Sequence, residues 1–289
     1  MKFLCVPLLL SALAIALPQA ETAPCVNTAP PRTITPSTGG TGPYKSHFFS
    51  DPTLPNHVVY QPKNPAGLKM PVIVWGNGQC FGDGAIFQAF LGQVASYGIV
   101  VLAGGKLGTG TNERVTAATM KQGIDWAVKV AGTGNYSHLD ASQLAVWGQS
   151  CGGLLAIQNA GDERVTSVGI FNSGSSMIGG SAVSLRGLKK PVFYFVGGTC
   201  DMAYPSAESD FKVIPQGTPA WKGNLPVGHT ATFPEVNAGR FGMAGVYLAQ
   251  WLLRGNESAS RWFVSGAKGE GWSVEHHDLD KIQVPAISK

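Results

Sequence analysis

Short and almost wholly apolar runs alternate along most of this chain with longer amphipathic segments. Six runs rich in β-branched and aromatic residues predict strands over 57–62, 71–75, 99–104, 143–148, 167–172 and 191–198. Runs that are apolar on both faces are typical of strands covered by helices on both sides of a sheet. Helices are predicted between and after them, over 84–96, 114–131, 151–160, 205–213 and 238–254. The alternation predicts an α/β fold with a mainly parallel central sheet and helices on both faces.

The N-terminal segment predicts export. Residues 1–20 carry one positive charge, a short apolar core and small residues near the end, a pattern typical of a secretory signal peptide. Cleavage after Ala16 or Ala20 fits this pattern, and we take Ala20. In an exported protein of a eukaryote, the sequons at Asn135 and Asn256 are N-glycosylation acceptors. We therefore expect a secreted, extracellular protein.

The remaining chain divides into an arm and one domain. Residues 21–44 are rich in Pro, Thr and Gly and predict an extended arm. Residues 45–289 are enough for a single α/β domain, and 44% of the whole chain is hydrophobic. The segment 172–190 is small and polar, so no large lid is expected. The tail after Arg261 predicts a short strand or an added hairpin of unassigned role.

Charge and membrane signals narrow the partners. The net charge is +4, and the basic residues are scattered along the chain, which argues against nucleic acid. No segment after the signal peptide is long and apolar enough to predict a membrane span. The glycine-rich run 103–110 follows a strand but lacks the spacing of dinucleotide and phosphate loops, and the cysteine and histidine spacing does not predict a metal site. We expect a monomer without cofactor or metal.

The segment from 145 to 153 carries the strongest chemical signal. An apolar strand run ends at Gly148, and Ser150 lies between Gly148 and Gly152 in the pattern G-x-S-x-G. That pattern is typical of a nucleophile elbow, a strained strand-to-helix turn where side chains at the two glycines would collide with backbone. Ser150 is the candidate nucleophile.

Chain order then selects an acid. Asp201 follows the apolar run 191–198 and a glycine turn, where a carboxylate can accept the N–H of an imidazole. Glu208 and Asp210 come soon afterwards, but we place them on the solvated face of a helix. Asp201 is therefore the candidate acid.

Chain order also selects a histidine. His229 follows Asp201 and precedes the last long helix, where a base on a loop is expected. His276 and His277 obey the same order and compete with it, although a polar surface turn in the tail explains them better. The order disfavours three histidines that precede Ser150, namely His47, His57 and His138.

An acyl-transfer site also needs two N–H donors for the developing oxyanion. The backbone N–H of Cys151, directly after the candidate nucleophile, is one candidate. The loop after the strand 71–75 supplies the other, for which we choose the peptide N–H of Asn77. Four residues in the neighbouring loops are expected to line a substrate site: Gly78, Phe81, Met202 and Tyr204.

Taken together, these motifs resemble a known family. WGNG at 75–78, GQSCGG at 148–153, GGTCD at 197–201 and GHTATF at 228–233 look like those of secreted α/β-hydrolases near dienelactone hydrolases, chlorophyllases and polyester hydrolases. The resemblance covers roughly residues 45–255 and implies the α/β-hydrolase fold. Polyester hydrolases usually have an aromatic residue after the loop glycine where this chain has Asn77, which argues against an aromatic clamp and polyester activity.

The expected pairing of cysteines follows from this arrangement. Four cysteines remain after the signal peptide, and they allow three pairings: Cys25, Cys80, Cys151 and Cys200. If Cys80 and Cys151 flank the oxyanion site, a disulfide between them would fix the two donor loops, which leaves Cys25 with Cys200.

The resemblance implies a serine esterase acting through an acyl-enzyme, with short or exposed acyl groups favoured. Two alternatives remain, namely an inactive binding or cell-wall protein on a hydrolase scaffold and an acyltransferase that uses the same residues. The sequence does not identify the ester.

Overall fold

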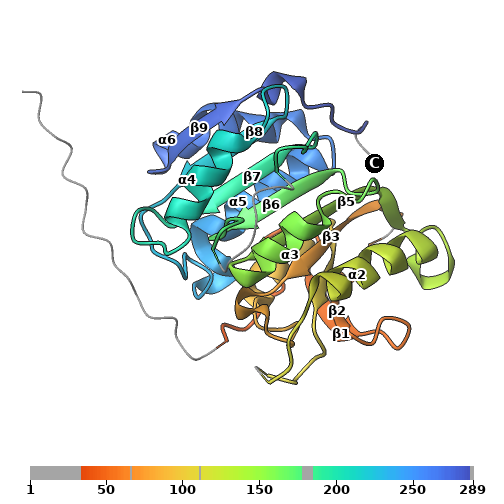
Figure 1. Ribbon diagram of the computed structural model, residues 1–289. Helices are drawn as coiled ribbons and strands as arrows, with labels where there is room; N and C mark the ends of the chain where they lie inside the picture. The colour runs from red at the N-terminus through yellow and green to blue at the C-terminus, as the bar shows by residue number, and fades with distance from the viewer. Residues whose placement is uncertain (1–33, 66, 111, 178–184, 287–289) are drawn as a thin grey trace, which may run out of the picture.

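All six predicted runs form strands of one mixed nine-stranded sheet in the computed structural model (Figure 1). The structure describes residues 34–65, 67–110, 112–177 and 185–286. The strands are β1 (Ser46–Ser50), β2 (His57–Pro62), β3 (Met70–Gly76), β4 (Val100–Gly104), β5 (Leu139–Gln149), β6 (Ser167–Phe171), β7 (Val192–Val196), β8 (Ala220–Asn224) and β9 (Ser273–His277). Their order across the sheet is β1-β2-β4-β3-β5-β6-β7-β8-β9. Neighbours from β4 across to β8 pair in parallel, whereas β1 with β2, β2 with β4 and β8 with β9 pair antiparallel.

Helices cover both faces of this sheet, as the apolar strands predict. The longer ones are α1 (Gln88–Ala95), α2 (Ala117–Val130), α3 (Cys151–Asn159), α4 (Tyr204–Val213) and α5 (Gly239–Leu252). One core packs α1 and α5 against Trp75 and Trp147, and the other packs α2, α3 and α4 against Val74 and Val146. Figure 1 shows α2, α3 and α4 in front of the sheet. The predicted α/β class with a mostly parallel sheet is therefore confirmed.

Shorter helices fill the connections and the tail. They are η1 (Gly78–Cys80), η2 (Gly134–Tyr136), η4 (Val236–Ala238), η5 (Glu257–Ala259), the π-helix η6 (Trp262–Gly266), α6 (Ala267–Gly269) and η7 (Leu279–Lys281). None of the helices in the described part of the chain is both long and apolar enough to cross a membrane.

The strand order reverses direction at β3. The chain leaves β3 through α1 to reach β4 on one side, and returns through α2 to β5 on the other side. In open parallel sheets, ligand sites form beyond the carboxyl ends of the strands at such a switch point. Gly76 ends β3, and Ser150 directly follows β5 at the same edge.

The polar pattern concealed β8, near the last edge of the sheet. The interior of β8 contains Lys222, whose side chain is 1% exposed and pairs with Glu208 at 2.6 Å and with Glu275 of β9 at 2.8 Å. A lysine at a strand centre looks solvent-exposed in sequence, but these two carboxylates compensate its burial. The tail strand that the sequence left unassigned is β9, which extends the sheet beyond β8.

Several expectations fall partly outside the described residues. The predicted signal peptide and Cys25 lie within residues 1–33, and residues 178–184 belong to the segment expected to lack a lid. Residues 34–45, which include the described part of the arm, contain no helix or strand.

Candidate active site

Ser150 occupies a strained turn between β5 and α3. Its backbone has φ +53° and ψ −121°, a conformation that non-glycine residues rarely adopt. A Cβ on Gly148 would collide with the backbone of Gly152, and one on Gly152 would collide with Gly76 at the end of β3. The glycines therefore allow β3, β5 and α3 to approach closely around the serine, which is 6% exposed.

His229 connects Ser150 to Asp201 through both ring nitrogens. Its Nε2 lies 3.0 Å from Ser150 Oγ, and its Nδ1 lies 2.6 Å from Asp201 Oδ1. The three residues come from the ends of β5 and β7 and from the loop after β8, and the sheet brings them to one edge. The structure thus places the three predicted residues in one hydrogen-bonded chain.

Asp201 is held in its ionised form. It is 1% exposed, and its oxygens accept hydrogen bonds from the backbone N–H groups of Gly197 and Ala203, each at 2.9 Å. Burial alone would raise the pKa of Asp201, but the hydrogen bond from His229 and these backbone donors hold that pKa below its usual value. An ionised Asp201 requires the ring proton at Nδ1 of His229, so Nε2 is left to accept the Ser150 hydroxyl proton.

A disulfide joins the loop after β3 to the start of α3, directly after Ser150. Cys80 and Cys151 are bonded, with their Cα atoms 5.2 Å apart. This confirms the expected pair, which joins η1 to the first residue of α3. Cys25 lies outside the described residues, so the pairing of Cys25 with Cys200 stays a prediction.

Asn77 has a structural role that its side chain explains. It is fully buried, its Oδ1 accepts from Trp75 Nε1 at 3.1 Å, and its Nδ2 donates to the carbonyls of Phe81, Asp83 and Gly104 at 2.7 to 3.0 Å. Because the side chain is engaged in these hydrogen bonds, the candidate oxyanion donor of Asn77 is its backbone N–H. The N–H of Cys151, in the first turn of α3, has no carbonyl partner within that helix.

The four predicted lining residues differ in exposure. Gly78 is buried against Gln149, and a Cβ there would collide with that side chain. Phe81 is half-buried with the Arg114 guanidinium 4.9 Å from its ring centre. Met202 is 66% exposed directly after Asp201, and Tyr204 is half-buried at the start of α4.

The competing residues lie elsewhere. His276 and His277 belong to β9, four strands from β5 and therefore about 19 Å away at ~4.8 Å per strand. Glu208 pairs with Lys222. The expectation that Asp210 faces solvent is wrong, because Asp210 is 1% exposed, binds Ser175, and has a pKa raised by burial.

Three polar residues around the site were missed in the sequence. Asn172 donates from Nδ2 to Asp201 Oδ2 at 2.7 Å, and Ser173 Oγ donates to the Ser150 carbonyl at 2.6 Å. Gln149 Nε2 donates to the His229 carbonyl at 3.2 Å. Each follows or ends an apolar strand run, a position at the carboxyl edge of the sheet that could have marked it.

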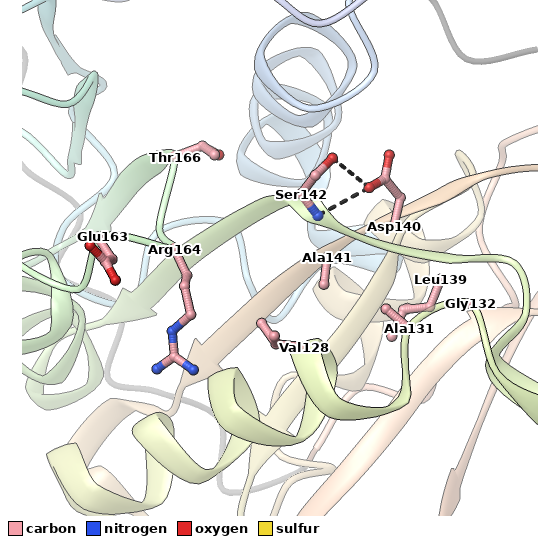
Figure 2. Close-up of a pocket in the computed structure, with 10 residues that line it drawn as sticks. All are labelled: Val128, Ala131, Gly132, Leu139, Asp140, Ala141, Ser142, Glu163, Arg164 and Thr166. Atoms are coloured by element: carbon pink, nitrogen blue, oxygen red, sulfur yellow. Dashed lines mark hydrogen bonds between the residues drawn. The ribbon is translucent and has the colours of Figure 1, made fainter.

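A shallow hollow of about 530 Å³ lies at the amino-terminal ends of β5 and β6, opposite the ends that carry Ser150 and Asn172. Figure 2 shows its lining at the start of β5, including Asp140 and Ser142, with Arg164 beside it. Ser142 precedes Ser150 by eight residues, roughly 26 Å along a strand, so the hollow is separate from the serine. In the described residues, no group of three or more His, Cys, Asp and Glu side chains could hold a metal ion.

Comparison of the sequence with protein-family models gives no match, and comparison with curated proteins gives no significant match.

Proposed function

We propose that this protein is a secreted serine esterase of the α/β-hydrolase fold. The observation that carries the proposal is the hydrogen-bonded chain from Ser150 through His229 to the ionised Asp201. The position of the serine on a strained turn after β5 supports it, because that geometry exposes a nucleophile at the sheet edge. The order Ser, Asp, His along the chain fits the same fold.

The proposed reaction uses each residue once in each half-cycle. Ser150 Oγ attacks the ester carbonyl carbon while its proton moves to Nε2 of His229, and the N–H groups of Cys151 and Asn77 stabilise the oxyanion. The C–O bond then breaks, and the proton passes from His229 to the leaving alcohol. Water attacks the acyl carbon while one of its protons moves to Nε2 of His229. The bond from the acyl carbon to Ser150 Oγ then breaks, His229 returns the proton to Oγ, and the carboxylic acid leaves. Asp201 stabilises the transient imidazolium throughout.

Secretion is part of the proposal, and the Cys80–Cys151 disulfide supports it, because structural disulfides persist in oxidising compartments. Asn135 is exposed in η2, and Asn256 begins η5 at the surface, so both are proposed glycan acceptors. A screen of acetyl, butyryl, feruloyl and polyester substrates identifies the ester class.

The first prediction concerns the nucleophile. Ser150→Ala removes the attacking oxygen, so hydrolysis of p-nitrophenyl acetate should fall about 10³-fold or more. The wild-type protein should also be labelled by a fluorophosphonate, and the Ser150→Ala variant should not. Initial rates and mass spectrometry of the labelled peptide check both outcomes.

The matched control is Ser142→Ala, which changes a serine near the start of β5, at the opposite end of the strand from Ser150. It should keep wild-type rates and labelling. If Ser150→Ala keeps most of the activity, Ser150 is not the nucleophile. A wild-type protein that takes no label would instead favour a binding protein. An added alcohol or amine that diverts the acyl group would favour an acyltransferase.

A further inference from the structure

The carboxyl end of β6 and the two residues after it contact Ser150, Asp201 and Gly228, the residue before His229. The backbone N–H of Ser150 donates to the carbonyl of Phe171 at 2.9 Å, and Ser173 Oγ donates to the carbonyl of Ser150. Between them, Asn172 reaches Asp201. One short segment therefore links the serine turn to the acid.

The Asn172 side chain also reaches the loop of the histidine. Its Nδ2 donates to Asp201 Oδ2 at 2.7 Å and lies 3.3 Å from the carbonyl of Gly228, the residue before His229. Both partners are acceptors only, so the amide nitrogen must face them. Asn172 thus joins the acid and the backbone of the base through one donor group.

An asparagine at this buried position lowers the stability of the fold, so packing alone does not account for the residue type. Asn172 is fully buried, its Oδ1 has no hydrogen-bond partner among the described residues, and its backbone lies at φ +45°. A buried oxygen without a donor destabilises a fold, and positive φ is tolerated by Asn better than by most residues. The residue type therefore fits a requirement for a donor at Asp201 in this backbone conformation.

We propose that Asn172 is a positioning residue that fixes the Asp201 carboxylate and the His229 loop for proton transfer to and from Ser150. The proposal rests on the esterase function above. Its Nδ2 hydrogen bond leaves Asp201 Oδ1 directed at His229 and keeps Oδ2 occupied. Asn172 touches neither substrate nor the reacting atoms, so it acts through Asp201 and His229.

Two substitutions separate the donor from the packing. Asn172→Asp keeps the shape and tolerates positive φ, but its carboxyl group donates only when protonated. Asn172→Gly suits the backbone conformation and removes the donor at every pH. A misplaced base lowers the chemical step more than substrate binding, so Asn172→Gly should lower kcat about 10- to 100-fold and change KM by less than about 3-fold.

Asn172→Asp should show a new dependence on pH. Two carboxyl groups in hydrogen-bond contact cannot both ionise readily, so at low pH the new acid donates its proton to Asp201 and activity is kept. At higher pH both ionise and repel each other. The ratio of variant to wild-type kcat should therefore fall about 10-fold or more between pH 6 and pH 9, whereas the ratio for Asn172→Gly should stay flat.

Asn159→Asp is the matched control. Asn159 is also buried and donates from Nδ2 to two backbone carbonyls, Ala117 and Leu155, at the far end of α3. Its variant should lower the thermal midpoint without a pH transition in the kcat ratio. A flat ratio for Asn172→Asp, or an Asn172→Gly variant within about 2-fold of the wild-type kcat, overturns the proposal.

A measurement without turnover keeps this proposal separate from the esterase function. The proton between His229 Nδ1 and Asp201 should give a far-downfield NMR resonance, assigned by its loss in His229→Gln. In folded Asn172→Gly this resonance should broaden or vanish at temperatures where the wild-type signal is sharp. If the wild type cleaves no ester but this change occurs, the positioning role stands and the proposed function fails. An unchanged resonance in folded Asn172→Gly overturns the positioning role.

Discussion

At the scale of single residues, two of the described non-glycine residues with positive φ lie at the proposed active site. Ser150 and Asn172 both have positive φ, and each follows a buried strand at the same edge of the sheet. Such strain persists only where the surroundings fix it. Here the ladder partners of β5 and β6 and the hydrogen bonds of Asp201 provide that constraint.

His57, which chain order disfavours as the catalytic base, is expected to affect stability. It is 1% exposed, and burial, which the nearby backbone of Thr119 opposes only in part, lowers its pKa to about 4. In the unfolded chain the His57 side chain has its usual pKa of 6.5 and takes up a proton more readily than in the folded state. The free energy of unfolding therefore falls as the pH decreases from about 6.5 to 4. Full stability from this group is present above pH 6.5.

The resulting prediction is a pH-dependent free energy of unfolding. Between pH 7 and pH 5 the wild type should lose about 2 kcal/mol more than His57→Leu, which cannot take up the proton. Guanidinium unfolding at the two pH values measures this difference. The exposed His276 provides the control, since His276→Leu should match the wild type in pH dependence. Equal pH dependence in His57→Leu would show that His57 is protonated without cost in the folded state.

At the scale of elements, the loop after β3 and the start of α3 work as a pair. The Asn77 side chain fixes the loop to Gly104 at the end of β4, and the Cys80–Cys151 disulfide fixes it to the elbow. Both candidate oxyanion donors belong to these two segments. Their relative position is therefore set by one covalent bond and one buried amide.

Removing that covalent bond should affect both stability and rate. The disulfide spans 71 residues of sequence, so in the chain-entropy model Cys80→Ala with Cys151→Ala should lower the free energy of unfolding by about 4 kcal/mol. The freed donor loops should also lower kcat about 10-fold. Denaturant unfolding and ester kinetics at a temperature where the variant is folded test both effects. A folded double variant with wild-type kcat would mean that the bond stabilises the fold without positioning the donors.

At the scale of the whole molecule, the start of the described chain is tied to the loop that carries the histidine. Thr35 Oγ1 donates to the carbonyl of Pro234 at 2.6 Å, and Thr38 Oγ1 donates to Asn237 Oδ1 at 2.5 Å. Backbone N–H groups of Ser37 and Thr41 donate to glutamine side chains of α1. The predicted arm thus bridges α1 and the segment between His229 and α5.

Deleting the arm should loosen that segment. A chain that begins at residue 43 should show a lower thermal midpoint and a kcat about 3- to 10-fold lower, with KM nearly unchanged, because the His229 loop loses its restraint. Thermal unfolding and ester kinetics measure these changes. Thr53→Val, a change on the exposed loop between β1 and β2, is the control and should keep the wild-type kcat. A truncated chain with unchanged kcat would limit the arm to a stabilising role.

The sequence alone determined the α/β class, the six inner strand runs and the residues of the hydrogen-bonded chain Ser150–His229–Asp201. Those features depend on local signals, since apolar periodicity, the glycine pair around Ser150 and the order of Asp201 and His229 are all visible along the chain. The strand β8 was missed because the burial of Lys222 depends on Glu208 and Glu275, which are distant in sequence.

Only the tertiary structure decided how the site is supported. It places the Asn172 amide in a hydrogen bond with Asp201, and it buries Asp210 in a hydrogen bond with Ser175. It also brings His229, and not His276, to Ser150. Both polar atoms of the Asn77 side chain have hydrogen-bond partners. Each of these depends on contacts between strand ends and loops that are far apart in sequence. The local pattern specifies which residues can do chemistry, and the packing of the sheet edge determines which of them meet and which hold the others in place.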